Sequence, residues 1–319
     1  MSLNSEDISI IIQLKAILEK MQTATVLGIF PVGFLLNTII ILVFTRKTFR
    51  SNSMGACNMI ISITNNIILI FNFAMYYTDS YGNNVLVRSD FFCVLFYYST
   101  RVFSSFHSWL IVMFSFNRLT YLAYPFRFKF MRKNMFLCVA SMVLFVINAL
   151  VFLPNFYYSV KTSSIVSNQT NQTLIVKTCG STAQIEALLD YIRMGSRIVI
   201  PVVLVILMDF YLIYKLEKTK NKVKSSTSSR KEYHFSKSIA ALSIFFVVSL
   251  LPILIILVFR NVFIKQINSW YKLKSIVDIA GGVSIFIASY NYCFMFFVNL
   301  KFNRVVRDEV AYLVKKLIQ

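Results

Sequence analysis

Charged residues are scarce in this chain. They make up 14% of its 319 residues, whereas 57% are hydrophobic. A soluble domain of this length carries more charge to cover its surface, so the composition excludes an ordinary soluble protein and favours a membrane protein. Internal repeats are also missing, and the one low-complexity stretch, the Ser/Lys/Arg-rich segment 220–231, contains no second domain.

A cleavable signal peptide is missing as well. Residues 1–22 are mixed and polar, and Glu6, Asp7, Lys15 and Lys20 interrupt any apolar core that a signal peptide would need. We therefore expect an N-terminal segment at 1–22 and a first hydrophobic span that acts as its own insertion signal.

Seven hydrophobic runs are long enough to cross a bilayer as helices. A helix rises about 1.5 Å per residue, so roughly 20 apolar residues span the hydrocarbon core. We number the runs as spans one to seven: 24–45, 57–77, 93–122, 135–157, 190–214, 237–260 and 275–299. They predict a membrane domain at 23–300, a tail at 301–319 and termini on opposite sides of the membrane.

Basic residues are distributed unequally between the two sides. The loops after spans one, three and five carry 15 Lys and Arg residues, and the other three loops carry 7. The richer set is expected in the cytoplasm, which places the N-terminus outside and the C-terminus inside. Basic loops on an anionic leaflet also account for the net charge of +20, so no nucleic acid partner is expected.

The five cysteines fall into two groups. Cys57, Cys138 and Cys293 lie within apolar spans, where a free buried thiol is the default. Cys93 and Cys179 both map to the outer, oxidising side, which predicts a disulfide between them, the alternative being two unpaired thiols.

The loop that contains Cys179 carries two further outward signals. Asn168 and Asn171 each begin an Asn-x-Thr glycosylation acceptor. The flanking stretches 157–166 and 174–179 are rich in β-branched and aromatic residues, which predicts a hairpin whose turn carries the sugars.

Polar and proline landmarks follow one another along the spans at defined offsets. They are Asn37, Asn65 at an offset of 28, Cys93 and Arg118 at an offset of 25, Pro125, Pro201, Pro252 and Asn291. In this order and spacing they resemble the landmarks of rhodopsin-like G-protein-coupled receptors. The resemblance implies an all-α membrane protein, a seven-transmembrane helix bundle with a short amphipathic cytoplasmic helix that opens near Arg304.

Several family positions carry a different residue here. The departures are Asn65 for an aspartate, Asn117 for the acid before Arg118, Leu250 for a tryptophan, Tyr292 for a proline and Met295 for a tyrosine. The last four of these remove much of the usual activation machinery, which leaves a non-signalling relative open as an alternative.

Arg118 is expected at the cytoplasmic end of span three, where a charge needs a partner. The resemblance implies a switch in which Glu232, near the start of span six, pairs with Arg118 in the inactive state, since Asn117 carries no charge. The alternative is that Glu232 pairs with a nearby lysine on a solvated face.

A polar set is expected deeper in the membrane. By resemblance, Asn65, His107 and Asn291 stand where family members ligate sodium, and Asn37 marks span one. Two amides and an imidazole offer no negative charge, so we expect a hydrogen-bonded network in place of a metal site. The alternative is a histidine satisfied locally by water.

The predicted ligand pocket lacks two familiar anchors. Thr100 stands where amine receptors carry aspartate, and Ile285 stands where opsins carry lysine. Arg101, Arg193 and Arg197 remain at pocket depth, with Asp190 and Asp278 as partial neutralisers. Such a cluster suits a peptide carboxylate, acidic side chains or a small organic anion. The alternative is snorkelling arginines paired with Asp190.

The sequence therefore predicts a plasma-membrane receptor that links an extracellular ligand to heterotrimeric G proteins. It is not expected to be an enzyme or to hold a cofactor. The hairpin and the absent anchors favour a peptide ligand, and Tyr292 in place of the helix-seven proline resembles some invertebrate neuropeptide receptors. A small multi-helix transporter is the alternative from another class, at which only Gly281 and Gly282 hint.

Overall fold

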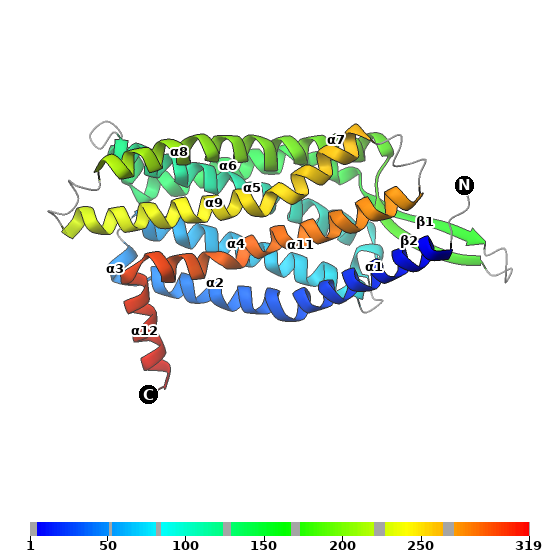
Figure 1. Ribbon diagram of the computed structural model, residues 1–319, viewed down its shortest axis with the longest axis horizontal. Coiled ribbons are helices and arrows are strands. Elements are labelled where there is room, and N and C mark those ends of the chain that lie inside the picture. Colours follow the sequence, from blue (N-terminus) through cyan, green and yellow to red (C-terminus); the bar gives the residue numbers. More distant parts are fainter. Residues whose placement is uncertain are drawn as a thin grey trace.

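A computed structural model describes residues 5–50, 53–80, 84–123, 129–166, 173–219, 227–263 and 271–318. These form a bundle of long helices with a two-stranded hairpin at one end (Figure 1). We call this the hairpin end of the bundle. The first helix begins there, and helix α12 leaves the bundle at the opposite end.

Seven helical rods make up the bundle, one for each predicted span. In chain order they are α1 (Ser5–Ala24) continued by α2 (Phe30–Phe44), α4 (Ser53–Ser80), α5 (Asp90–Ala123), α6 (Asn134–Val151), α7 (Ala183–Ile192) continued by α8 (Ile200–Thr219), α9 (Thr227–Val262) and α11 (Tyr271–Phe302). Short π-helical segments, Thr25–Ile29 and Arg193–Val199, join the two divided rods. The predicted seven-helix fold is confirmed.

Six of these rods are long and apolar enough, within the described residues, to cross a membrane. Helix α5 is the exception, although its 34 residues would span about 50 Å. Its polar side chains are turned inward, and Ser104, Ser105, His107 and Ser115 are all buried. Helix α5 contacts α4, α6, α8 and α9, so the protein interior and not lipid surrounds its polar residues.

The first helix starts earlier than predicted. Span one was expected from residue 24, but the helix already begins at Ser5, and its membrane-compatible stretch is Ala16–Phe44. Segment Ser5–Ala24 contains no glycine or proline and is rich in helix formers, so nothing interrupts the helix. Leu18 packs where Gly282 of α11 leaves room for it.

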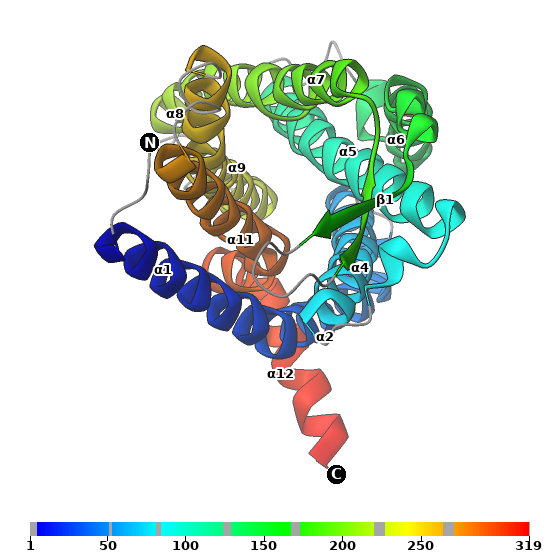
Figure 2. The ribbon, with the colours of Figure 1, turned by 90° about the vertical axis from the view of Figure 1, so that its right-hand side faces the viewer.

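The predicted hairpin is present at the end of the bundle. Strands β1 (Ser159–Val166) and β2 (Thr173–Gly180) pair antiparallel, with Val160 opposite Cys179. Cys179 forms a disulfide with Cys93 at the start of α5, with 5.7 Å between their Cα atoms. Figure 2 shows β1 lying across part of the opening between the helices.

The turn between β1 and β2 lies outside the described residues. It contains Asn168 and Asn171, whose glycosylation stays a prediction. Pro125, in the segment after α5, is outside the described part as well.

Helix α12 (Arg304–Ile318) follows α11 at the opposite end and is the amphipathic helix that was predicted there. The Nε of Arg46, just past α2, lies 2.9 Å from a carboxylate oxygen of Glu309. The same guanidinium sits 4.7 Å from the ring centre of Tyr312. These contacts anchor α12 to the end of the first rod.

Four short elements complete the described chain. They are α3 (Lys47–Arg50) and three 3-10 turns, Val85–Val87, Lys129–Arg132 and Leu153–Tyr157.

Candidate functional site

The bundle contains a cavity of about 460 Å³ between its helices, near the hairpin end. Helices α4, α5, α9 and α11, the π-helical segment Arg193–Val199 and the turn before α5 all contribute to its wall. The lining residues are Asn72, Met75, Tyr76, Asn84, Leu86, Tyr97, Thr100, Arg101, Ser104, Arg193, Arg197, Ile253, Ile285, Ala288, Ser289 and Tyr292.

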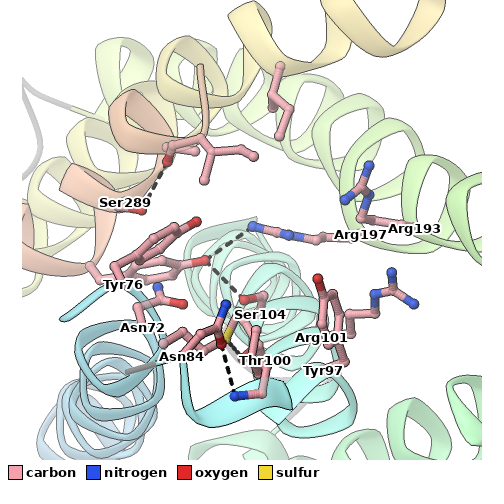
Figure 3. Close-up of a pocket in the computed structure, with 16 residues that line it drawn as sticks. Asn72, Tyr76, Asn84, Tyr97, Thr100, Arg101, Ser104, Arg193, Arg197 and Ser289 are labelled. Atoms are coloured by element: carbon pink, nitrogen blue, oxygen red, sulfur yellow. Dashed lines mark hydrogen bonds between the residues drawn. The ribbon is translucent and has the colours of Figure 1, made fainter. Parts of the chain in front are cut away.

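Arginines dominate the charge of this cavity. Arg101, Arg193 and Arg197 line it, and none of the described residues in its wall is acidic. The sequence predicted all three at pocket depth, and the structure brings them to one cavity. Arg193 and Arg197 are four residues apart on one helical segment, so they approach the cavity from the same side (Figure 3).

Two predicted neutralisers lie beside the cavity and not in its wall. A carboxylate oxygen of Asp190 lies 3.2 Å from Arg193, so this acid does offset part of the charge. Asp278 is exposed and does not line the cavity, which corrects its prediction as a pocket residue. It stands seven residues before Ile285, about 10 Å further along α11 and beyond the lining turns.

Arg101 has a structural role that the sequence did not reveal. Its Nη1 donates to Oδ1 of Asn155 at 2.5 Å, and its Nη2 donates to the hydroxyl of Tyr158 at 2.8 Å. The guanidinium also lies 5.4 Å from the ring centre of Tyr97 and 4.9 Å from that of Tyr158. Arg101 therefore ties α5 to the segment after α6, which leaves less of it for a ligand.

We expect Arg101→Lys to destabilise the receptor. Lysine keeps the charge, but its single ammonium group cannot reproduce the two separate nitrogens with which the planar guanidinium binds Asn155 and Tyr158. Two hydrogen bonds from a charged group are therefore weakened. The free energy of unfolding should fall by about 2 kcal/mol, measured as a lower thermal midpoint of the purified protein. Arg88→Lys, at an exposed arginine near the same end, is the control. Equal midpoints for the two variants would contradict the structural role.

Thr100 lines the cavity without offering its hydroxyl proton to it. The Thr100 hydroxyl donates to the carbonyl of Phe96, one turn earlier, at 2.7 Å. This is a local helix bond, so Thr100 contributes shape more than recognition.

Tyr292 lines the cavity and also contacts residues of several other helices. Its hydroxyl accepts from Nη2 of Arg197 at 3.4 Å and donates to Oγ of Ser104, also at 3.4 Å. Its carbonyl accepts from Nδ2 of Asn37 at 2.9 Å. Its ring meets the ring of His107 edge to face, with 5.1 Å between the centres. Tyr292, on the seventh rod, therefore contacts the first, third and fifth rods.

The predicted polar network does not form as expected. No hydrogen bond joins the described side chains of Asn65, His107 and Asn291 to one another, although all three are buried. The Tyr292 ring, which stands where the family has proline, packs against the ring of His107 instead. Asn37 is bonded to the Tyr292 carbonyl, while the amide atoms of Asn65 have no partner among the described residues.

Metal binding has no obvious donor set in the described residues. No group of three or more His, Cys, Asp or Glu side chains among them lies close enough together to hold an ion.

The helix ends far from the hairpin carry the predicted switch. Arg118 of α5 is buried, at 1% exposure, and Asn117 is buried beside it. Nδ2 of Asn117 donates to the carbonyl of Met131 at 2.8 Å, so this position holds the turn Lys129–Arg132 and carries no charge. Glu232 belongs to α9, but its side chain lies outside the described part, and its pairing stays a prediction.

Asp209 is a buried acid that the sequence analysis did not single out. It lies on α8 at 6% exposure and faces the hydroxyl of Ser243 on α9. Its Oδ1 has no hydrogen-bond partner among the described residues. One turn along α8, Leu212 packs with Leu119, the neighbour of Arg118. Asp209 is the single charged residue of the apolar stretch 198–214, and this was the signal that could have found it.

The chain matches the family model of the 7 transmembrane receptor (rhodopsin family) over residues 36–294. This match covers most of the chain and includes at least part of each of the seven rods, so the protein belongs to the rhodopsin family of seven-transmembrane receptors. A comparison with curated proteins finds no match to this chain.

Membership decides the class of the protein. Rhodopsin-family receptors are multi-pass proteins of the plasma membrane that act by binding and not as enzymes, and they have extracellular ligands and G-protein partners. The transporter alternative is not supported, because Gly281 and Gly282 lie inside the unbroken helix α11 and mark no break.

Proposed function

We propose that this receptor binds a peptide at the hairpin end of the bundle and activates a heterotrimeric G protein at the opposite end. The hairpin, the N-terminus and the acceptors Asn168 and Asn171 would then be extracellular, and α12 would be cytoplasmic. The excess of basic residues in the loops of the opposite end supports this orientation. The disulfide Cys93–Cys179 supports it too, since disulfides persist in oxidising compartments.

The arginines of the cavity carry the proposal for the ligand. Arg193 and Arg197 face a cavity whose described wall contains no acid, and only Asp190 beside it offsets their charge. A guanidinium binds a carboxylate through paired, charge-assisted hydrogen bonds. We therefore propose a peptide with a free carboxyl terminus or with acidic side chains near an amidated end. A small organic anion has the same chemistry and is the second candidate.

The hairpin supports a peptide over a smaller ligand. Strands β1 and β2 lie at the mouth of the bundle and are pinned to α5 by the disulfide (Figure 2). The backbone nitrogen of Val160 also donates to Oδ1 of Asp90, at 2.7 Å, which fixes β1 over the start of α5. A held hairpin offers an extended peptide a second surface above the cavity.

A ligand screen tests the proposal. The receptor is expressed with a promiscuous G protein and exposed to peptides supplied both as free acids and as C-terminal amides. For any activating peptide we expect Arg197→Gln to lower potency by about 30-fold or more, because the peptide's anionic group is left buried without its partner. Arg88→Gln, which removes an exposed arginine outside the cavity, should leave potency unchanged.

Two outcomes would count against this function. If the activating peptide is as potent on Arg197→Gln as on the wild type, Arg197 does not take part in binding the peptide. A receptor that reaches the cell surface, binds peptides and yet signals neither with nor without them would be the non-signalling relative.

A further inference from the structure

We propose that Tyr292 competes with the ligand for the guanidinium of Arg197. Its phenol occupies the Arg197 guanidinium in the unliganded receptor, and an anionic group of the ligand displaces it. This inference rests on the proposed function, in which the cavity takes an anionic ligand, and it adds the residue that converts binding into movement of the bundle.

The three arginines of the cavity differ in how firmly they are held. The guanidinium of Arg101 is bound by Asn155 and Tyr158. Arg193 faces the carboxylate of Asp190. Arg197 contacts a neutral phenol instead, and it reaches across the cavity toward the side of Ser104 and Tyr76 (Figure 3). Arg197 is therefore the arginine that an incoming anion recruits most easily.

Bond lengths decide the direction of the exchange. The Arg197 to Tyr292 and Tyr292 to Ser104 hydrogen bonds are both 3.4 Å long, beyond the usual range and therefore weak. A carboxylate binds a guanidinium at about 2.7 to 2.9 Å and about twice as strongly as a neutral acceptor does. An anionic group that enters the cavity wins the guanidinium from the phenol.

Release of the phenol reaches several helices at once. Tyr292 is only 4% exposed, and outside the cavity it packs in a buried cluster with residues of the first and second rods. It holds Ser104 of α5 through its hydroxyl and His107, one turn further on, through its ring. The His107 ring lies 6.2 Å from that of Phe246 on α9. A ligand on Arg197 thereby changes the packing between α5, α9 and α11.

The role of Tyr292 also accounts for a departure from the family. A proline at this position has no hydroxyl and no ring that could reach Arg197 or His107. Tyrosine leaves α11 unbroken and adds both contacts. The substitution therefore exchanges a backbone feature of the helix for a side-chain contact that the ligand controls.

The test uses benzoate as a minimal anionic probe and benzamide as its neutral counterpart. The thermal midpoint of the purified full-length receptor is followed as each compound is titrated. Benzoate should raise the midpoint of the wild-type protein and benzamide should not. Tyr292→Phe, which removes only the competing hydroxyl, should reach its half-maximal shift at about fivefold lower benzoate, the ratio expected for one neutral hydrogen bond.

The control is Tyr290→Phe, which removes a half-exposed tyrosine hydroxyl from the same helix two residues away. It should behave as the wild type. In cells, Tyr292→Phe at matched surface expression should raise ligand-independent signalling and Tyr290→Phe should not, since only the first frees α11 from Ser104 and Arg197.

The outcomes separate this inference from the function on which it rests. If Arg197→Gln abolishes the benzoate shift while Tyr292→Phe matches the wild type in titration and basal signalling, the anion site stands and the competition is wrong. If Arg197→Gln responds to benzoate as the wild type does, or if benzoate does not shift the midpoint of the wild type, the anion site is wrong. The competition is then wrong as well.

Discussion

Ligand-independent signalling should rise about tenfold when Glu232 is replaced by alanine, and signalling should be lost when Arg118 is replaced by alanine. A partly buried ion pair contributes about 1 to 3 kcal/mol after desolvation, and about 1.4 kcal/mol changes a rare active population tenfold. Arg118 is almost fully buried, so its charge needs an anionic partner, and Asn117 beside it is a neutral amide that cannot supply one. Loss of Arg118 should abolish signalling because, once released from Glu232, its side chain is the group that we propose contacts the G protein.

The measurement is basal G-protein activation at matched surface expression. Asp209→Asn is the informative companion, because Asp209 is the buried acid on α8 near the level of Arg118. Higher basal activation in Glu232→Ala alone supports the predicted pair. Higher basal activation in Asp209→Asn, with no change in Glu232→Ala, would indicate that Asp209 on α8 is the partner of Arg118. Wild-type activity in both variants would leave helix packing as the restraint.

Replacing Cys93 with serine should sharply reduce surface expression and ligand binding. The disulfide to Cys179 spans 86 residues of chain, and closing a loop of that size stabilises a fold by about 4.6 kcal/mol in the chain-entropy model. It also holds β2 against the start of α5 at the mouth of the cavity. Cell-surface immunolabelling measures expression, ligand binding to intact cells measures the second effect, and thiol labelling detects the freed cysteine.

The double variant provides the sharper test of the disulfide. Surface expression and ligand binding should fall by the same amount in Cys93→Ser, in Cys179→Ser and in the double variant, since either substitution already removes the whole bond. Each single variant should expose one new thiol, and the double variant should expose none. Cys138→Ser, at an exposed free cysteine of α6, should change neither expression nor binding. Additive losses in the double variant would contradict a bond between the two cysteines.

The seven rods and the hairpin were predictable because each depends on local sequence. A membrane helix must satisfy its own backbone hydrogen bonds, so length and hydrophobicity suffice to find it. Even so, the start of the first helix was placed at residue 24 when it begins at Ser5. Hydrophobicity marks where lipid begins and does not mark where a polar helix continues beyond it.

The roles of the pocket arginines could not be predicted in the same way. Sequence spacing put Arg101, Arg193 and Arg197 at one depth, but it could not show that Arg101 is held by Asn155 and Tyr158, 54 and 57 residues away. Nor could it show that Asp278 lies clear of the cavity. Such contacts depend on how separate helices are rotated against each other, which local periodicity does not specify.

The sequence by itself determined the class of this protein, its seven spans, its disulfide pair and the positions at which it departs from its family. The tertiary structure alone decided what those departures do. Tyr292 is only a missing proline in the sequence, whereas in the bundle it joins Arg197, Ser104 and His107, which lie 95, 188 and about 185 residues away. The physical reason is that hydrophobicity is a property of each segment, while a polar contact between helices exists only when packing brings its two partners together.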